Sequence, residues 1–161
     1  MRNVKKNRGF TLVEIMIVVT IIGLLATISL PVFKQVGLKA RGTAFLNDGR
    51  VFSEAFHRYA QEHGEFPRNQ RNRENFPAAM EGYISYDQWV RTTPFGGKYS
   101  WDDYRRANRS GHGGAIMILK GTFKMKDIRQ IDSWFDDGNI KTGVIQVRSG
   151  GATVYYMLED K

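Results

Sequence analysis

The histidines and the adjacent acids are the first places to look for catalysis or metal binding. His57 and His63 are six residues apart on a predicted helix, a spacing that does not place two ligands on one metal ion, and the third histidine is His112. Asp102 and Asp103 are neighbours on a predicted strand, so their side chains point to opposite faces and do not pair. No phosphate-binding loop or HExxH helix occurs. We therefore predict surface histidines, no catalytic residues and no enzyme.

Asp136, Asp137 and Asn139 bring oxygen atoms together in one short stretch, and oxygen is the ligand that calcium prefers. The stretch follows a predicted helix at residues 125–135 and reads as its exit turn. Full EF-hand spacing and a bidentate glutamate twelve positions on are both missing. A turn held by side-chain hydrogen bonds is the favoured interpretation, so no metal and no other cofactor is predicted.

Two clusters of arginines, with a tyrosine beside the second, could contact nucleic acid. They comprise Arg68, Arg71 and Arg73, then Tyr104, Arg105, Arg106 and Arg109. The clusters are more than 30 residues apart, and a solvated loop on a cationic surface explains them more simply. Nucleic-acid binding remains an alternative that the sequence does not favour.

Glu14 is the one charged residue in an apolar run at residues 10–33. As a helix this run would be about 36 Å long, which is enough for the ~30 Å hydrocarbon core of a membrane. An unpaired carboxylate at membrane depth costs on the order of a few kcal/mol. We therefore expect Glu14 to have a partner.

Residues 1–9 form a basic leader, with four Lys or Arg and no acid. Removing them would lower the formal net charge from +8 to +4, since 20 basic residues would face 16 acidic ones. Positive flanks resist translocation, so the N-terminus is predicted to be cytoplasmic. The 161 residues suit one domain, or one domain plus an anchor, and without cysteine neither a disulfide nor a thiolate metal site can form.

Two ordinary explanations of the leader and the apolar run remain open. A cleaved secretory signal has an apolar core of about 7 to 15 residues, shorter than this run, although Ala26 and Ser29 offer a weak cleavage site. A plain membrane anchor explains the length and the leader but gives no reason for Glu14.

The motif RGFTLVE, residues 8–14, closely resembles the class III signal of type IV pilins and type II secretion pseudopilins. Gly23 and Pro31 also match positions of that family's first helix. The resemblance implies that a prepilin peptidase at the cytoplasmic face cuts between Gly9 and Phe10 and methylates the new amine of Phe10. It also implies that this amine meets Glu14 of a neighbouring subunit in a staggered filament, which gives Glu14 its partner.

Beyond the run, an apolar stripe recurs at helical spacing and predicts that the helix continues. The stripe comprises Leu38, Phe45, Phe52, Phe56 and Tyr59, and a second face carries Arg50, Glu54, Arg58 and Glu62, which alternate in sign. We favour packing of the stripe against the chain's own sheet, with packing against neighbouring subunits as the alternative. Gly64 is predicted to end the helix, which would be about 80 Å long if straight.

The remainder predicts a small head with four short strands, at residues 98–104, 114–121, 142–148 and 152–158. The last two flank SerGlyGly, a short hairpin turn. The stretches YAQEHGEFP and TPFGGKYSW look like the helix exit and the sheet entry of pseudopilin-like proteins. The C-terminal disulfide that is frequent in that family cannot form here, so we expect the terminal hairpin to hold the C-terminal segment.

Together these features predict an α+β, pilin-like fold, in which a long N-terminal helix, transmembrane and then amphipathic, packs on a small antiparallel sheet. The predicted parts are a leader at 1–9, a transmembrane and assembly helix at 10–33, its amphipathic continuation at 34–63 and a head at 64–161. The resemblance implies a prepilin of the bacterial inner membrane that polymerises with pilin-like subunits into a periplasmic or cell-surface filament. A membrane-anchored binding domain and a DNA-binding competence-type pilin are the alternatives. The sequence does not separate a type IV pilus from a type II secretion pseudopilus.

Overall fold

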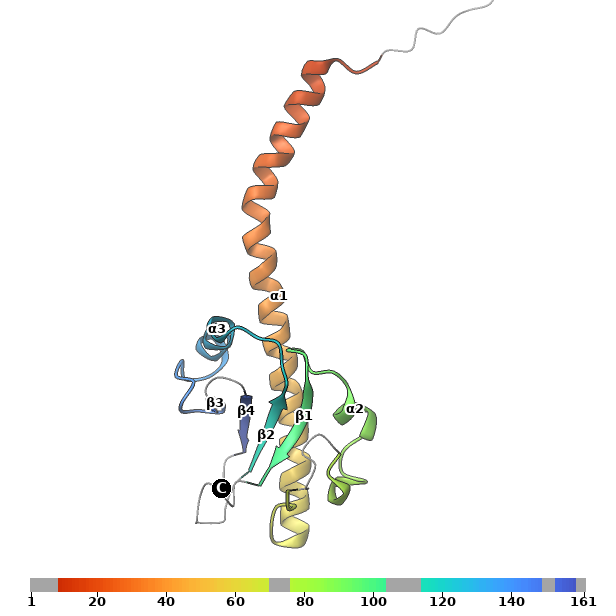
Figure 1. Ribbon diagram of the computed structural model, residues 1–161, viewed down its shortest axis with the longest axis vertical. Coiled ribbons are helices and arrows are strands. Elements are labelled where there is room, and N and C mark those ends of the chain that lie inside the picture. The colour runs from red at the N-terminus through yellow and green to blue at the C-terminus, as the bar shows by residue number, and fades with distance from the viewer. Residues whose placement is uncertain (1–8, 70–75, 104–113, 149–152, 159–161) are drawn as a thin grey trace, which may run out of the picture. The chain divides into compact units, whose positions relative to one another are not determined.

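The computed structural model divides the chain into two compact units, Met1–Gly37 and Leu38–Lys161. The residues that it describes are 9–69, 76–103, 114–148 and 153–158. In chain order the elements are α1 (Leu12–His63), η1 (Ala78–Met80), α2 (Tyr86–Val90), β1 (Lys98–Asp102), β2 (Gly114–Leu119), α3 (Met125–Phe135), β3 (Ile145–Arg148) and β4 (Thr153–Leu158) (Figure 1). Helix α1 contributes residues to both units.

In the first unit, α1 exposes apolar side chains on every face. All of the large apolar side chains from Leu12 to Val36 have exposed fractions between 51% and 84%. The hydroxyls of Thr20, Thr27 and Ser29 each donate a 2.8 Å hydrogen bond to the backbone carbonyl four residues earlier, so the helix satisfies its own polar side chains. This stretch is long and apolar enough to cross a membrane, as predicted.

The second unit contains a four-stranded sheet with the order β1-β2-β4-β3, in which all neighbouring strands are antiparallel. The predicted α+β class and the four predicted strands are confirmed. The strands are shorter than predicted: β2 ends at a turn where Lys120 has φ of 56°, and β3 begins only after Gly143, which has φ of 72°. The predicted SerGlyGly turn between β3 and β4 lies outside the described residues.

The apolar stripe of α1 forms the centre of the core. Phe45, Phe52 and Phe56 are buried, and the ring of Phe52 lies 5.0 Å from the rings of both Trp89 and Tyr99. Figure 1 shows the sheet alongside this part of α1. Leu38 and Tyr59 pack at the edges of the same cluster, so the predicted packing of the stripe on the chain's own sheet is confirmed. The charged face of Arg50, Glu54, Arg58 and Glu62 is exposed, also as predicted.

Two glycines let the head approach α1 closely. A Cβ atom on Gly49 would lie 2.3 Å from the ring of Tyr156 in β4, and one on Gly42 would lie 3.0 Å from Ile131 in α3. Each position therefore serves as a contact point between α1 and another element, a role that the sequence did not predict.

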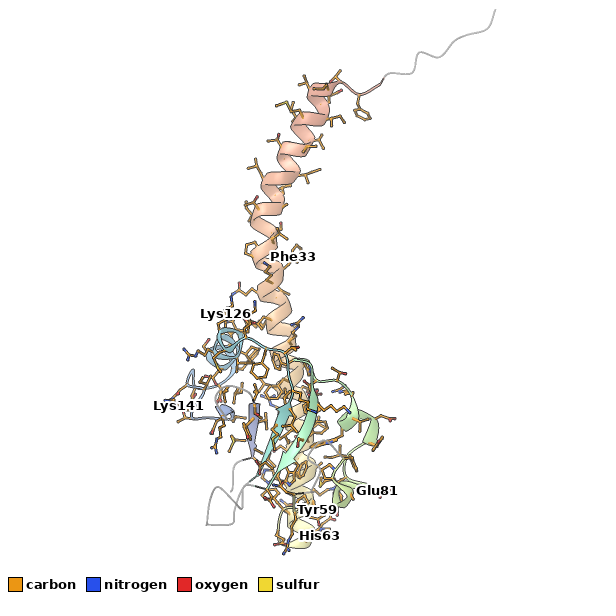
Figure 2. The ribbon with its side chains drawn as sticks, viewed as in Figure 1. Phe33, Tyr59, His63, Glu81, Lys126 and Lys141 are labelled. Carbon is orange, nitrogen blue, oxygen red and sulfur yellow. The ribbon has the colours of Figure 1, made fainter. Side chains whose placement is uncertain are left out.

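The end of α1 follows the prediction at Gly64, which has φ of 77° and donates its N–H to the carbonyl of Ala60 at 2.8 Å. Tyr59 and His63 stack in the last turn with ring centroids 4.0 Å apart, and Figure 2 labels both. The chain then turns back over the sheet, where the indole N–H of Trp101 donates to the carbonyl of Pro67 at 2.7 Å.

Candidate functional site

The first turn of α1 is closed by hydrogen bonds between Thr11 and Glu14. The backbone N–H and the hydroxyl of Thr11 each donate a 2.8 Å hydrogen bond to Oε2 of Glu14. In return, the backbone N–H of Glu14 donates to the hydroxyl oxygen of Thr11 at 3.3 Å. This reciprocal arrangement is a capping box, which satisfies two N–H groups at the helix start.

The capping box gives Glu14 a partner within its own chain. This role of Thr11 was not predicted, although a threonine followed three residues later by glutamate, just before an apolar run, is the signature of such a box. The same carboxylate that the family signal singles out therefore also fixes where α1 begins.

The predicted cleavage position lies just before this turn. Gly9 and Phe10 precede the first residue of α1, and both are exposed, Phe10 by 84%. A Cβ atom on Gly9 would meet nothing within 4 Å. The Gly9–Phe10 bond therefore lies outside the helix, with open space beside Gly9.

A second polar group joins α1 to the head. The carboxylate of Asp48 is buried, forms an ion pair with Arg91, and accepts a 2.5 Å hydrogen bond from the hydroxyl of Tyr99. Burial, and secondly this bond to Asp48, raise the pKa of the Tyr99 hydroxyl above its usual range. Tyr99 therefore remains a neutral donor, and the group has the character of a structural link.

The predicted hydrogen-bonded turn after α3 is present. Asp137 accepts from the N–H of Asn139 at 2.8 Å and from the hydroxyl of Thr142 at 2.5 Å, while Asn139 accepts from the N–H of Lys141 at 3.2 Å. Asp136 accepts from the N–H of Ile145 at 2.7 Å and so ties the turn to the start of β3.

The sequence did not indicate that Asp132 belongs to the same place. Asp132 is fully buried in the last turn of α3, and its carboxylate lies with those of Asp136 and Asp137. Burial, and then the negative charges of these two neighbours, raise the pKa of Asp132 to about 6. Burial of one particular helix residue depends on tertiary packing, which local sequence does not specify.

The other described residues that were considered for catalysis or metal binding make packing contacts and hydrogen bonds within the fold. His57 packs edge-on to Phe66 with ring centroids 5.4 Å apart, and His112 lies outside the described residues. Asp102 and Asp103 both bond to Asn69, with which they make hydrogen bonds of 2.8 to 3.1 Å. Asn69 thus anchors the segment after α1 to the end of β1.

The arginine clusters are tested at only one position. Arg68 lies 4.0 Å from the carboxylate of Glu65 on an exposed surface. The other members, namely Arg71, Arg73, Tyr104, Arg105, Arg106 and Arg109, lie outside the described residues. Nucleic-acid binding, the alternative that the sequence does not favour, therefore stays untested by the described part of the chain.

Residues 4–30 match the family described as the prokaryotic N-terminal methylation motif. Over 62 residues the chain is 36% identical to a fimbrial protein of Neisseria meningitidis serogroup A and 34% identical to the type IV major pilin protein PilE1 of Neisseria gonorrhoeae. The N-terminal part of the chain therefore carries this motif and is similar to the same part of type IV pilins. These relatives are named as a fimbrial protein and a major pilin, which agrees with the expectation of a structural subunit.

The similarity of the chain to those relatives is confined to part of each protein. Each alignment covers 38% of this chain, and the chain spans 36% and 38% of the lengths of the two relatives. The fold is similar to that of the major type IV pilin PilA1 from Clostridium difficile, with a TM-score of 0.54 at 15% identity over 76% of this chain and 97% of that one. The pilin-like fold extends well beyond the sequence match.

Proposed function

We propose that the chain is a structural subunit of a type IV pilus, which is cut between Gly9 and Phe10, methylated on the new amine and polymerised through α1. The observation that carries this proposal is the apolar surface of α1, which is at least half exposed at every large apolar side chain from Leu12 to Val36. Such a surface requires lipid before assembly and neighbouring helices after it. The relatives are fimbrial proteins and major pilins, which favours a surface pilus over a secretion pseudopilus.

The proposed subunit has four parts. Residues 1–9 are a leader that remains in the cytoplasm, because their positive charges resist translocation. Residues 10–33 span the inner membrane and later form the filament core, residues 34–63 continue the helix along the head, and residues 64–161 complete the head. The partners are the prepilin peptidase, the inner membrane and other pilin-like subunits.

Glu14 is proposed to bind a second partner after cleavage. Among the described residues, the carboxylate of Glu14 accepts two hydrogen bonds, from the backbone N–H and from the hydroxyl of Thr11. Both end at Oε2. Oε1 is thus available to the positively charged amine that cleavage creates on Phe10 of a neighbouring subunit. The pair would offset the cost of a carboxylate at membrane depth, which is on the order of a few kcal/mol.

Intact-mass spectrometry of the protein from its native membrane tests the processing step. We expect a chain that lacks residues 1–9 and carries one added methyl group on Phe10. An uncut chain, or a mature chain that begins near Ser29, would contradict the pilin pathway and support a plain anchor or a secretory signal.

Two substitutions at Glu14 separate assembly from capping. Glu14→Gln retains an oxygen that can accept from Thr11 but removes the charge, whereas Glu14→Ala removes both. We expect both variants to be inserted and cut, and neither to yield filaments by shearing or electron microscopy, because the neighbour's amine would be left buried and unpaired.

Thr11→Ala is the matched control, since it removes the capping hydroxyl and leaves the carboxylate in place. We expect filaments from this variant. Normal filament yield from Glu14→Gln, with none from Glu14→Ala, would instead assign Glu14 to capping alone.

A further inference from the structure

The second unit has a basic end, which comprises six exposed side chains, namely Lys39, Arg41, Lys98, Lys120, Lys124 and Lys126. Two described acids are close to these residues in the chain. Asp48 is buried and forms an ion pair with Arg91, and Asp127 lies in the first turn of α3. The basic end therefore carries a clear excess of positive charge.

Two neighbouring hollows bring together the part of the basic end that comes from α1, β1 and the turn after β2. The first hollow lies between Arg41 of α1 and the segment after α2. The second shares Thr92 with the first and is lined by Lys98 and Lys120. Residues that are far apart in the sequence thus form one cationic surface.

The first turn of α3 adds Lys124 and Lys126 to this surface. The backbone N–H of Thr122 donates to the carbonyl of Phe95 at 2.7 Å, which holds the segment before α3 beside the loop that leads into β1. Lys124 is the N-cap residue of α3, and its side chain makes no capping hydrogen bond. Because the start of a helix is the positive end of its dipole, two lysines there are unfavourable without an anion nearby.

The other end of the second unit has the opposite balance of charge. Figure 2 labels Lys126 at one end of this unit and Glu81 at the other. The charged residues at the end of α1 and in the segments that follow include more acids than bases, namely Glu62, Glu65 and Glu81 against Arg58 and Arg68. Positive charge is therefore gathered at one end of the unit.

The basic end begins shortly after the apolar run ends. Lys39 and Arg41 follow residue 33 by six and eight positions in the continuous helix α1, which is about 9 to 12 Å along its axis. The headgroup layer on each side of the hydrocarbon core is about 5 to 8 Å thick, and the potential of a charged surface extends about 8 Å further at physiological ionic strength. A membrane spanned by residues 10–33 would bring its surface charge within reach of both side chains.

The cations of the basic end need an anionic partner from outside the described head. Among the described residues, Lys39, Arg41, Lys98, Lys124 and Lys126 take part in no ion pair. Positive residues resist translocation, so their concentration on the translocated side of the proposed span runs against the usual bias. A layer of lipid phosphates matches cations that are spread over several elements better than one small anion does.

We propose that the basic end of the second unit binds anionic phospholipid headgroups while the subunit is stored in the membrane. This inference rests on the proposed membrane span and assigns a surface role to the head. Binding holds the head against the bilayer until the subunit is extracted into a filament. A nucleic acid also presents phosphates, but the span would bring the membrane close to Lys39 in every stored subunit.

The test uses the full chain in lipid nanodiscs, with Gln130→Cys as the site of a fluorescent label. The chain has no cysteine of its own, and Gln130 is exposed in α3, one turn from Lys126. Discs of phosphatidylcholine alone are compared with discs that also contain phosphatidylglycerol, both with a nitroxide quencher on a few headgroups. We expect stronger quenching in the anionic discs and no difference at about 1 M salt, where the Debye length is about 3 Å.

Variants with equal losses of charge distinguish the two ends of the head. Lys124→Gln with Lys126→Gln removes two charges from the basic end, and Arg58→Gln with Arg68→Gln is the matched control at the other end. Each cation near an anionic surface favours binding roughly fivefold, so the first pair should lower the ratio of bound to unbound heads about 25-fold. The control pair should leave this ratio unchanged. Arg41→Gln, on α1, is a second variant that leaves α3 intact.

Retention of the chain in the discs after an alkaline wash tests the span separately. A chain that washes out would overturn both the proposed span and the lipid-binding surface. A retained chain with equal quenching in the two kinds of disc, or an undiminished response in the Lys124/Lys126 and Arg41 variants, would overturn the surface alone. Binding of a DNA duplex by the basic end, with no response to phosphatidylglycerol, would assign the surface to nucleic acid instead.

Discussion

The two units of the chain use the same helix in opposite ways. In the first unit, every face of α1 is apolar and exposed, whereas in the second unit one stripe is buried and the opposite face is charged and exposed. The buried stripe is covered by the chain's own strands and by α2, through contacts such as those of Phe52 with Trp89 and Tyr99. A helix with one apolar stripe can bury that stripe against its own head. A helix that is apolar on every face must bury its surface in lipid or against other chains.

The contrast also extends to small residues. Gly37, in the first unit, has open space where a side chain would begin, and Gly49, in the second, faces the ring of Tyr156. At Gly37 an added side chain would contact nothing, while at Gly49 the absence of a side chain permits close packing of Tyr156 against the helix. The same residue type thus has different consequences on the two sides of the boundary at residue 38.

Removing the first unit should have the largest effect, on the solubility and the oligomeric state of the chain. A shortened chain that begins at Lys34 lacks the apolar run but retains the buried stripe and the head, so we expect it to be soluble and monomeric without detergent. Size-exclusion chromatography with light scattering measures this, with the full chain as the control that requires detergent. Large aggregates of the shortened chain would show that the stripe is an exposed assembly surface.

A buried and an exposed apolar side chain of α1 should differ strongly in their contribution to the head. Phe52→Ala removes a ring that is 1% exposed and should lower the free energy of unfolding of the head by about 3 to 5 kcal/mol. Ile22→Ala, at a side chain that is 59% exposed, should leave it unchanged. Chemical denaturation followed by tryptophan fluorescence compares the two, and similar losses would contradict the division.

Alanine substitutions at Gly49 and Gly37 should differ in stability by a smaller amount. Gly49→Ala introduces a clash with Tyr156 and should cost about 1 to 3 kcal/mol of stability, reduced by the helix propensity that alanine gains. Gly37→Ala gains the propensity, up to about 1 kcal/mol locally, without a clash. Thermal unfolding of the two variants in one detergent gives the comparison, which fails if Gly49→Ala is the more stable.

The sequence predicts the parts of this fold that depend on local pattern. The apolar run, the stripe that includes Phe45 and Phe56, the end of α1 at Gly64 and the existence of four strands all follow from periodicity or from turn residues. Strand ends were less well predicted, because the backbone at Lys120 and Gly143 determines where pairing stops.

The contacts between distant residues could not be predicted in this way. Asp48 and Tyr99 are 51 positions apart, and nothing near either one indicates the other. Asp132 resembles any polar residue of an exposed helix until tertiary packing buries it. The capping box at Thr11 differs from these long-range contacts, because its sequence signature is local. It was not predicted because Glu14 was interpreted only as a charge within the apolar run.

The order of the strands determines when the head can be completed during synthesis. The sheet runs β1-β2-β4-β3, so the strand made last among the described residues lies between two strands made earlier. Until residues 153–158 have left the ribosome, β2 and β3 each lack the neighbour that joins them, and Gly49 has no ring of Tyr156 to pack against. A chain whose synthesis stops before residue 153 would therefore have an open sheet edge, which exposes unpaired backbone to aggregation and to proteases. Because β4 is an interior strand, the sheet can be completed only after this strand has been made.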